Sequence, residues 1–111
     1  MNLQEYIKRG QLKKASPDVS LVKSLIETAK IDRRFLIKTE LNEDSARKLM
    51  TNHYDVLRSI LEAIASISGY KIYSHEAITS FITEILNEKE IADSFDRYRK
   101  IRNSINYYGA S

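Results

Sequence analysis

The chain is organised around residues 91–109, IADSFDRYRKIRNSINYYG, where apolar side chains recur at the spacing of a helix. With each residue turned about 100° from the last, one face collects Ile91, Phe95, Tyr98, Ile101, Ile105 and Tyr108. Arg102 interrupts this face. A guanidinium keeps its proton, so it must reach water or meet a carboxylate, a phosphate or carbonyl groups. We therefore expect a helix whose Arg102 is either ion-paired at the edge of the core or functional, with Asn106 placed to share its ligand.

The composition fits one domain, 1–111, with no need of disulfide bonds. The sequence has no cysteine, and its amino terminus, MNLQEYIKRG, has no apolar signal core. Both features favour a cytoplasmic protein. No apolar run approaches the length that spans a bilayer, so we expect no membrane role. The 18 basic and 15 acidic residues leave a net charge of +3, which permits an acidic partner without requiring one.

Helices with short connections are expected throughout, because the chain has only three glycines and one proline and its apolar residues have helical period. A short helix over 2–9 ends at Gly10. The next begins with Ser16 as N-cap and Pro17 as its first residue, and runs to about 39. Others cover 42–69, 74–86 and the final stretch, with KKASPD as the loop before the helix that ends near 39 and YKIY as the loop after Gly69. In the helix over 74–86, Ser74 is the expected N-cap, and the expected inward residues are Ile78, Phe81, Ile82 and Ile85. The class predicted is all-α, an antiparallel up-and-down four-helix bundle with a short extra N-terminal helix.

The longest helix has a nearly heptad apolar pattern. One row holds Ala46, His53, Ile60 and Ile67, and the next holds Met50, Leu57 and Ile64. His53 is therefore expected to point inward as a hydrogen-bonded core residue. Before the last helix, Asn87 followed by Glu90 resembles a capping box.

The sequence lacks the residues that several kinds of catalytic or cofactor-binding site require. Two histidines, His53 and His75, with no cysteine and no His-Glu-x-x-His pattern, are too few for a tight transition-metal site. No glycine-rich phosphate loop is present, and no serine lies in a nucleophile elbow. We therefore expect no metal and no cofactor.

The last helix combines cationic and aromatic residues of the types that bind phosphates and stack bases. They are Arg97, Arg99, Lys100, Arg102, Tyr98, Tyr107 and Tyr108. The basic residues point in several directions, and Asp93 and Asp96 offset their charge. A solvated face with core tyrosines is accordingly favoured over a continuous binding groove.

The segment RYRKIRNSINYYG resembles the signature helix of HEPN domains, and GYKIYSHEAITSFI resembles the loop and helix that precede it in that family. The similarity covers roughly 17–109. It implies an up-and-down bundle that commonly forms homodimers, with the signature arginines of two protomers facing a shared cleft. Many such proteins work beside a minimal nucleotidyltransferase as a toxin–antitoxin pair, and the active members are metal-independent endoribonucleases.

Carried over residue by residue, Arg102 matches the signature arginine and Asn103 the polar residue after it. Active members then have a histidine four to six residues on, where this chain has Tyr107, Tyr108 and Gly109. A phenol with a pKa near 10 is a poor general base. His75 resembles a histidine common at that helix start, and is interpreted as a cap or packing residue that could also face the cleft.

The resemblance thus favours a non-catalytic homodimeric module that contacts RNA, a nucleotide or a nucleotidyltransferase partner. The binding residues expected are Arg102, Asn103, Asn106, Arg99 and Tyr98. One alternative is a metal-independent endoribonuclease that uses Arg102 with Tyr107, Tyr108 or His75. A second is a purely structural assembly partner in which Arg102 forms an ion pair at an interface.

Overall fold

The computed structural model describes residues 2–108, with the backbone alone described for 106–108. In this part of the chain, helices account for most residues, as the sequence predicts, and two short strands accompany them. The elements are α1 (Leu3–Lys8), β1 (Leu12–Lys14), α2 (Val19–Lys38), α3 (Ala46–Ile67), β2 (Tyr70–Ile72), α4 (His75–Glu84) and α5 (Lys89–Tyr108). Over the described residues, none of the helices combines the length and hydropathy needed to cross a bilayer.

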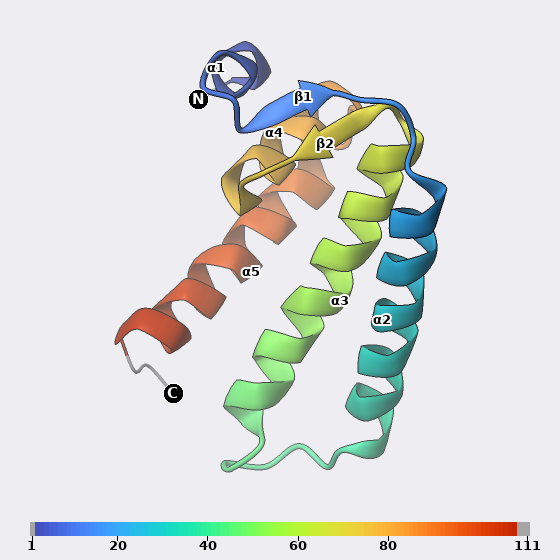
Figure 1. The fold of residues 1–111 in the computed structure, drawn as a ribbon. Coiled ribbons are helices and arrows are strands. Elements are labelled where there is room, and N and C mark those ends of the chain that lie inside the picture. Colours follow the sequence, from blue (N-terminus) through green and yellow to red (C-terminus); the bar gives the residue numbers. More distant parts are fainter. Residues whose placement is uncertain (1, 109–111) are drawn as a thin grey trace.

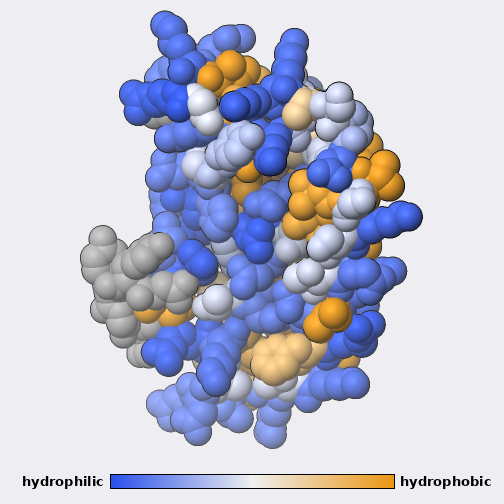
Figure 2. All heavy atoms as spheres, viewed as in Figure 1, coloured by the Kyte–Doolittle hydropathy of each residue, from blue (hydrophilic) through white to orange (hydrophobic). Residues whose placement is uncertain are grey.

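The long helix α3 lies at the centre of the arrangement (Figure 1). It packs along α2 on one side and against α5 on the other, and α4 contacts both α3 and α5. The two strands and α1 lie together at the end of the molecule where α3 ends and α4 begins. The surface shown in Figure 2 is largely hydrophilic and is interrupted by separate apolar patches.

The two strands are the main departure from the expected all-helical chain. They pair antiparallel, with Leu12 opposite Ile72 and Lys14 opposite Tyr70. The segments KKASPD and YKIY were both expected to be loops. Each is too short to be recognised alone, and a strand forms because the other supplies its hydrogen-bonding partner. Leu12 is fully buried, so the sheet fastens the N-terminal segment to the core.

The core gathers side chains from every helix except α2, together with Leu12 of β1. Its largest fully buried members are Tyr54, Phe81, Phe95, Leu12, Ile78 and Ile82. The inward positions expected for α4 are confirmed for Ile78, Phe81 and Ile82. From α2 only Ala29 is buried, because that helix packs mainly along α3.

Three predicted helix starts are wrong by a few residues. Asp18, rather than Ser16, caps α2, since its Oδ1 accepts a hydrogen bond from the Leu21 N–H at 3.0 Å. Helix α3 begins at Ala46 instead of at residue 42. Asn87 has a φ of +55°, which is incompatible with the expected capping box, and α5 begins at Lys89. Polar residues in the sequence show roughly where a helix begins. The hydrogen bonds of the folded structure determine which residue is the N-cap.

The expected inner faces of α3 and α5 are partly wrong. His53 is exposed, as are Ile60 and Ile67, and the buried face of α3 instead contains Tyr54 and Leu61. On α5, Phe95 is buried as expected, whereas Ile91 and Ile101 are 50% and 43% exposed. The other buried positions carry small residues: Ser59, Ala63, Ala65, Ser66 and Ala92. Closely approaching helices need small side chains there, and a pattern of large apolar residues does not reveal such positions.

Candidate anion-binding site

Four residues selected from the sequence line one cavity of about 340 Å³: His75, Arg99, Arg102 and Asn103. They come from the start of α4 and from the middle of α5. The remaining lining residues are Gln11, Tyr73, Ser74 and Glu76. The fold thus brings the two parts of the sequence that carry the resemblance to the same place.

The start of α4 is held in position by hydrogen bonds to both the helix and the sheet. Ser74 caps the helix as predicted, with its Oγ accepting from the Ala77 N–H at 3.2 Å. The same hydroxyl donates to Oε1 of Gln11 at 3.3 Å. The Tyr73 N–H donates to the Gln11 carbonyl at 2.8 Å, which continues the pairing of the two strands. The sheet that the sequence did not reveal therefore helps to place His75 in the cavity.

Arg102 holds a hydrogen-bond donor that no described residue uses. Its Nε is buried and has no hydrogen-bond partner in that part of the chain. Its guanidinium carbon lies 5.5 Å from the centroid of the Tyr54 ring, a cation–π arrangement that holds the group in place. A buried donor without an acceptor costs roughly 1–3 kcal/mol. An acceptor group on a ligand would recover that cost.

Arg99 differs from Arg102 because carboxylates already neutralise it. Its Nη2 donates to Oδ1 of Asp96 at 2.8 Å, and its Nη1 lies 3.9 Å from Oε1 of Glu76. Lys100 approaches the other Asp96 oxygen at 3.0 Å. Burial alone would raise the pKa of Asp96, but the hydrogen bonds from Arg99 and Lys100 lower it overall. Arg102 is therefore the cation of this cavity that remains available to a ligand.

A hydrogen bond with Tyr54 orients His75, and the surroundings of the imidazole favour its neutral form. The Tyr54 hydroxyl lies 2.9 Å from Nδ1 of His75, and the Tyr54 side chain is fully buried. Burial raises the pKa of Tyr54 to about 12, so its hydroxyl keeps its proton and can donate it to an unprotonated Nδ1. Burial, followed by the nearby Arg58 and Arg102, lowers the pKa of His75. With Nδ1 as the acceptor of the Tyr54 hydrogen bond, the single proton of a neutral imidazole is on Nε2, where it is a hydrogen-bond donor.

The other sequence candidates do not join this cavity. Tyr98 lines a separate apolar groove between α3 and α5, where its ring meets that of His53 edge-on at a centroid distance of 5.6 Å. The side chains of Asn106, Tyr107 and Tyr108 lie outside the described residues. Tyr54 was missed because the adjacent His53 was assigned to the inner face.

Among the residues with described side chains, no three histidine or carboxylate groups come together as metal ligands. Comparisons of the chain with protein-family models, curated proteins and solved structures found no significant match.

Proposed function

We propose that this chain is a HEPN-like module that binds RNA without cleaving it, through phosphate contacts in the cavity around Arg102. The observation that carries the proposal is the buried Nε of Arg102, which has no hydrogen-bond partner among the described residues. The proposal includes the finer architecture that the resemblance implies, an antiparallel up-and-down four-helix bundle.

The chemistry of the cavity favours a group that only accepts hydrogen bonds. Arg102 offers a charged donor, and neutral His75 offers its Nε2–H. Asn103 adds an amide within the same cavity. The start of α4 contributes the partial positive charge of a helix N-terminus. A phosphate diester carries a full negative charge and four oxygens, and it meets this set of donors better than a neutral ligand would.

Binding of a fluorescently labelled single-stranded RNA of mixed sequence tests the proposal. We expect wild-type protein to bind with an affinity that falls as salt rises, and Arg102→Gln to weaken binding and reduce the salt dependence. Arg97→Gln is the matched control, because Arg97 is exposed on the same helix and lies outside the cavity. Equal losses in the two variants would refute a specific role for Arg102.

A metal-independent endoribonuclease is the second candidate, favoured by the presence of His75 beside Arg102 in one cavity. General-base catalysis needs an unprotonated nitrogen directed at the substrate hydroxyl. A hydrogen bond donated by Tyr54 to Nδ1 occupies that nitrogen and places the proton on Nε2. This arrangement supports binding over cleavage. RNA cleavage that persists with a chelator and disappears in His75→Ala would establish the enzyme instead.

A homodimer and a nucleotidyltransferase partner remain predictions of the resemblance. The molecular mass in solution tests the first, and co-purification with a co-expressed nucleotidyltransferase tests the second. If the chain is purely an assembly partner, Arg102→Gln should weaken association while leaving RNA binding unchanged.

A further inference from the structure

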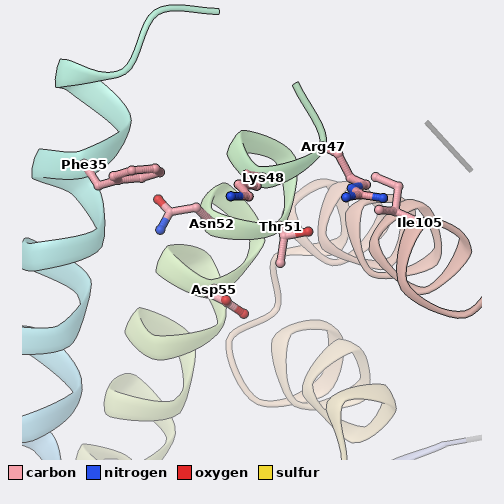
Figure 3. A pocket seen from close by; sticks show the side chains of 7 residues that line it. All are labelled: Phe35, Arg47, Lys48, Thr51, Asn52, Asp55 and Ile105. Carbon is pink, nitrogen blue, oxygen red and sulfur yellow. The ribbon is translucent and has the colours of Figure 1, made fainter. Parts of the chain in front are cut away.

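A second cavity, of about 480 Å³, lies over the first turns of α3 between α2 and α5 (Figure 3). Its lining residues are Phe35, Arg47, Lys48, Thr51, Asn52, Asp55 and Ile105. None of them was selected from the sequence as a site residue. Figure 3 shows Asn52 reaching from α3 toward Phe35 on α2, whereas Arg47 extends toward Ile105 on α5. The cavity therefore has an aromatic and amide side and a cationic side.

On the first side, two groups lack the partners that a closed protein interior would provide. Phe35 is 44% exposed, so its ring has a face available for stacking. The side-chain Oδ1 of Asn52 is buried and accepts no hydrogen bond within the described part of the chain. An aromatic face beside an unpaired amide is suited to a flat ligand that carries its own hydrogen-bond donors.

On the second side, positive charge is left without compensation. Arg47 lies on this side, and Figure 3 shows Lys48 nearer to Asn52. Both cations are exposed, and no described carboxylate pairs with either. Asp55, the only acid in the lining, already lies 3.9 Å from Arg58. The cations are therefore available to an anionic group attached to the flat ligand.

We propose that this cavity is a nucleotide subsite that prefers adenine, in which the base stacks on Phe35 and hydrogen-bonds to Asn52 while Arg47 and Lys48 hold its phosphate. An asparagine amide matches the paired donor and acceptor of adenine, N6–H and N7. Oδ1 of Asn52 would accept a hydrogen bond from the N6–H of adenine, which supplies the donor that this oxygen lacks within the described residues.

Both cavities include residues of α5, and the proposal is that one strand contacts both. Ile105 lines the second cavity and lies about one turn of α5 beyond Arg102. On α3, Asp55 follows directly after Tyr54, whose hydroxyl binds His75 in the first cavity. The inference rests on the proposed function in this respect, since it treats the two cavities as neighbouring contacts for a single RNA strand.

The experiment measures binding of labelled hexaribonucleotides, A6 and U6, by fluorescence anisotropy at low salt. We expect wild-type protein to prefer A6 by about 5-fold or more, and Asn52→Leu to abolish that preference. Phe35→Leu keeps the apolar volume and removes the stacking face, so it should weaken A6 binding by about 5-fold or more. Arg47→Ala should weaken both ligands alike and reduce the salt dependence by about one charge.

Matched controls are available on α2. Ile37→Ala removes an apolar side chain that is more exposed than Phe35, and Arg34→Ala removes an exposed cation next to Phe35. Neither residue lines the cavity, so both variants should bind within about 2-fold of wild type. Thermal unfolding of each variant confirms that it is folded. Unchanged A6 binding by Phe35→Leu, or equal binding of A6 and U6 by wild-type protein, overturns the subsite.

The two proposals fail separately. If Arg102→Gln abolishes binding of mixed-sequence RNA while Phe35→Leu and Asn52→Leu bind normally, the proposed function stands and the subsite is wrong. If A6 binding depends on Phe35 and Asn52 but not on Arg102, the subsite stands and the role of Arg102 is wrong.

Discussion

Replacement of Tyr54 by phenylalanine tests the hydrogen bond that orients the candidate site. The change removes only the hydroxyl that lies 2.9 Å from Nδ1 of His75. The ring is fully buried and stacks on Phe95 at a centroid distance of 5.3 Å, and phenylalanine preserves this packing. It also preserves the aromatic face under Arg102. Loss of one such hydrogen bond costs about 1 kcal/mol, which lowers the midpoint of thermal unfolding by roughly 4–8 °C in a domain of this size.

The same variant should change the titration of His75. In the wild-type protein the bond from Tyr54 favours neutral imidazole, because Nδ1 must be unprotonated to accept it. We therefore expect the pKa of His75, which burial and neighbouring cations lower, to move upward in Tyr54→Phe. Nitrogen NMR of the imidazole measures both the pKa and the nitrogen that carries the proton, which should be Nε2 in the wild type.

Tyr73→Phe is the matched control, since Tyr73 also borders the cavity but is 53% exposed. Its stability should remain within about 0.5 kcal/mol of the wild type. A wild-type imidazole protonated on Nδ1, or a Tyr54→Phe variant with unchanged stability and unchanged His75 titration, would refute the orientation argued above. His75 would then present a free nitrogen to the cavity, which would strengthen the case for catalysis.

Four further measurements test the fold around the site. Leu12→Ala leaves a cavity beneath the sheet and should cost roughly 2–5 kcal/mol in chemical denaturation. Ser74→Ala removes the cap of α4 and should cost about 1 kcal/mol, whereas Ser74→Asp should retain most of the stability. The stability that depends on neutral His75 should be complete above about pH 6.5 and lost as the pH falls through its lowered pKa; His75→Gln should remove that slope. Asp96 has a lowered pKa as well, so its contribution should disappear only at still lower pH, below about 4, and Asp96→Asn should reduce this acid sensitivity.

Helix content and several helix boundaries follow from local sequence, because the interactions that determine them are only a few residues apart. Ser74 lies three residues before the amide that it caps, and Gly10 ends α1 with a φ of +73°. The inward residues of α4 were predicted because that short helix is buried along a continuous apolar face. The presence of Arg102 on a half-buried face was also predicted, since an arginine within an apolar pattern is visible in sequence.

The candidate site depended on contacts between residues far apart in the chain. Tyr54 and His75 are 21 positions apart, and Gln11 reaches Ser74 across 63 positions. The spacing of apolar residues along the chain gives no information on which distant residues form such pairs. Phe35 and Asn52 likewise lie on different helices and meet only because α2 packs along α3.

The sequence by itself therefore determined which segments are helical and that one arginine would need a polar partner. Only the tertiary structure decided which face of α3 is buried, that two short segments pair as strands, and which side chains surround Arg102. The physical reason is that helix formation is governed by local backbone hydrogen bonds and side-chain spacing. Burial is decided instead by the neighbour that each face meets, and small residues such as Ala65 and Ala92 permit the closest approach.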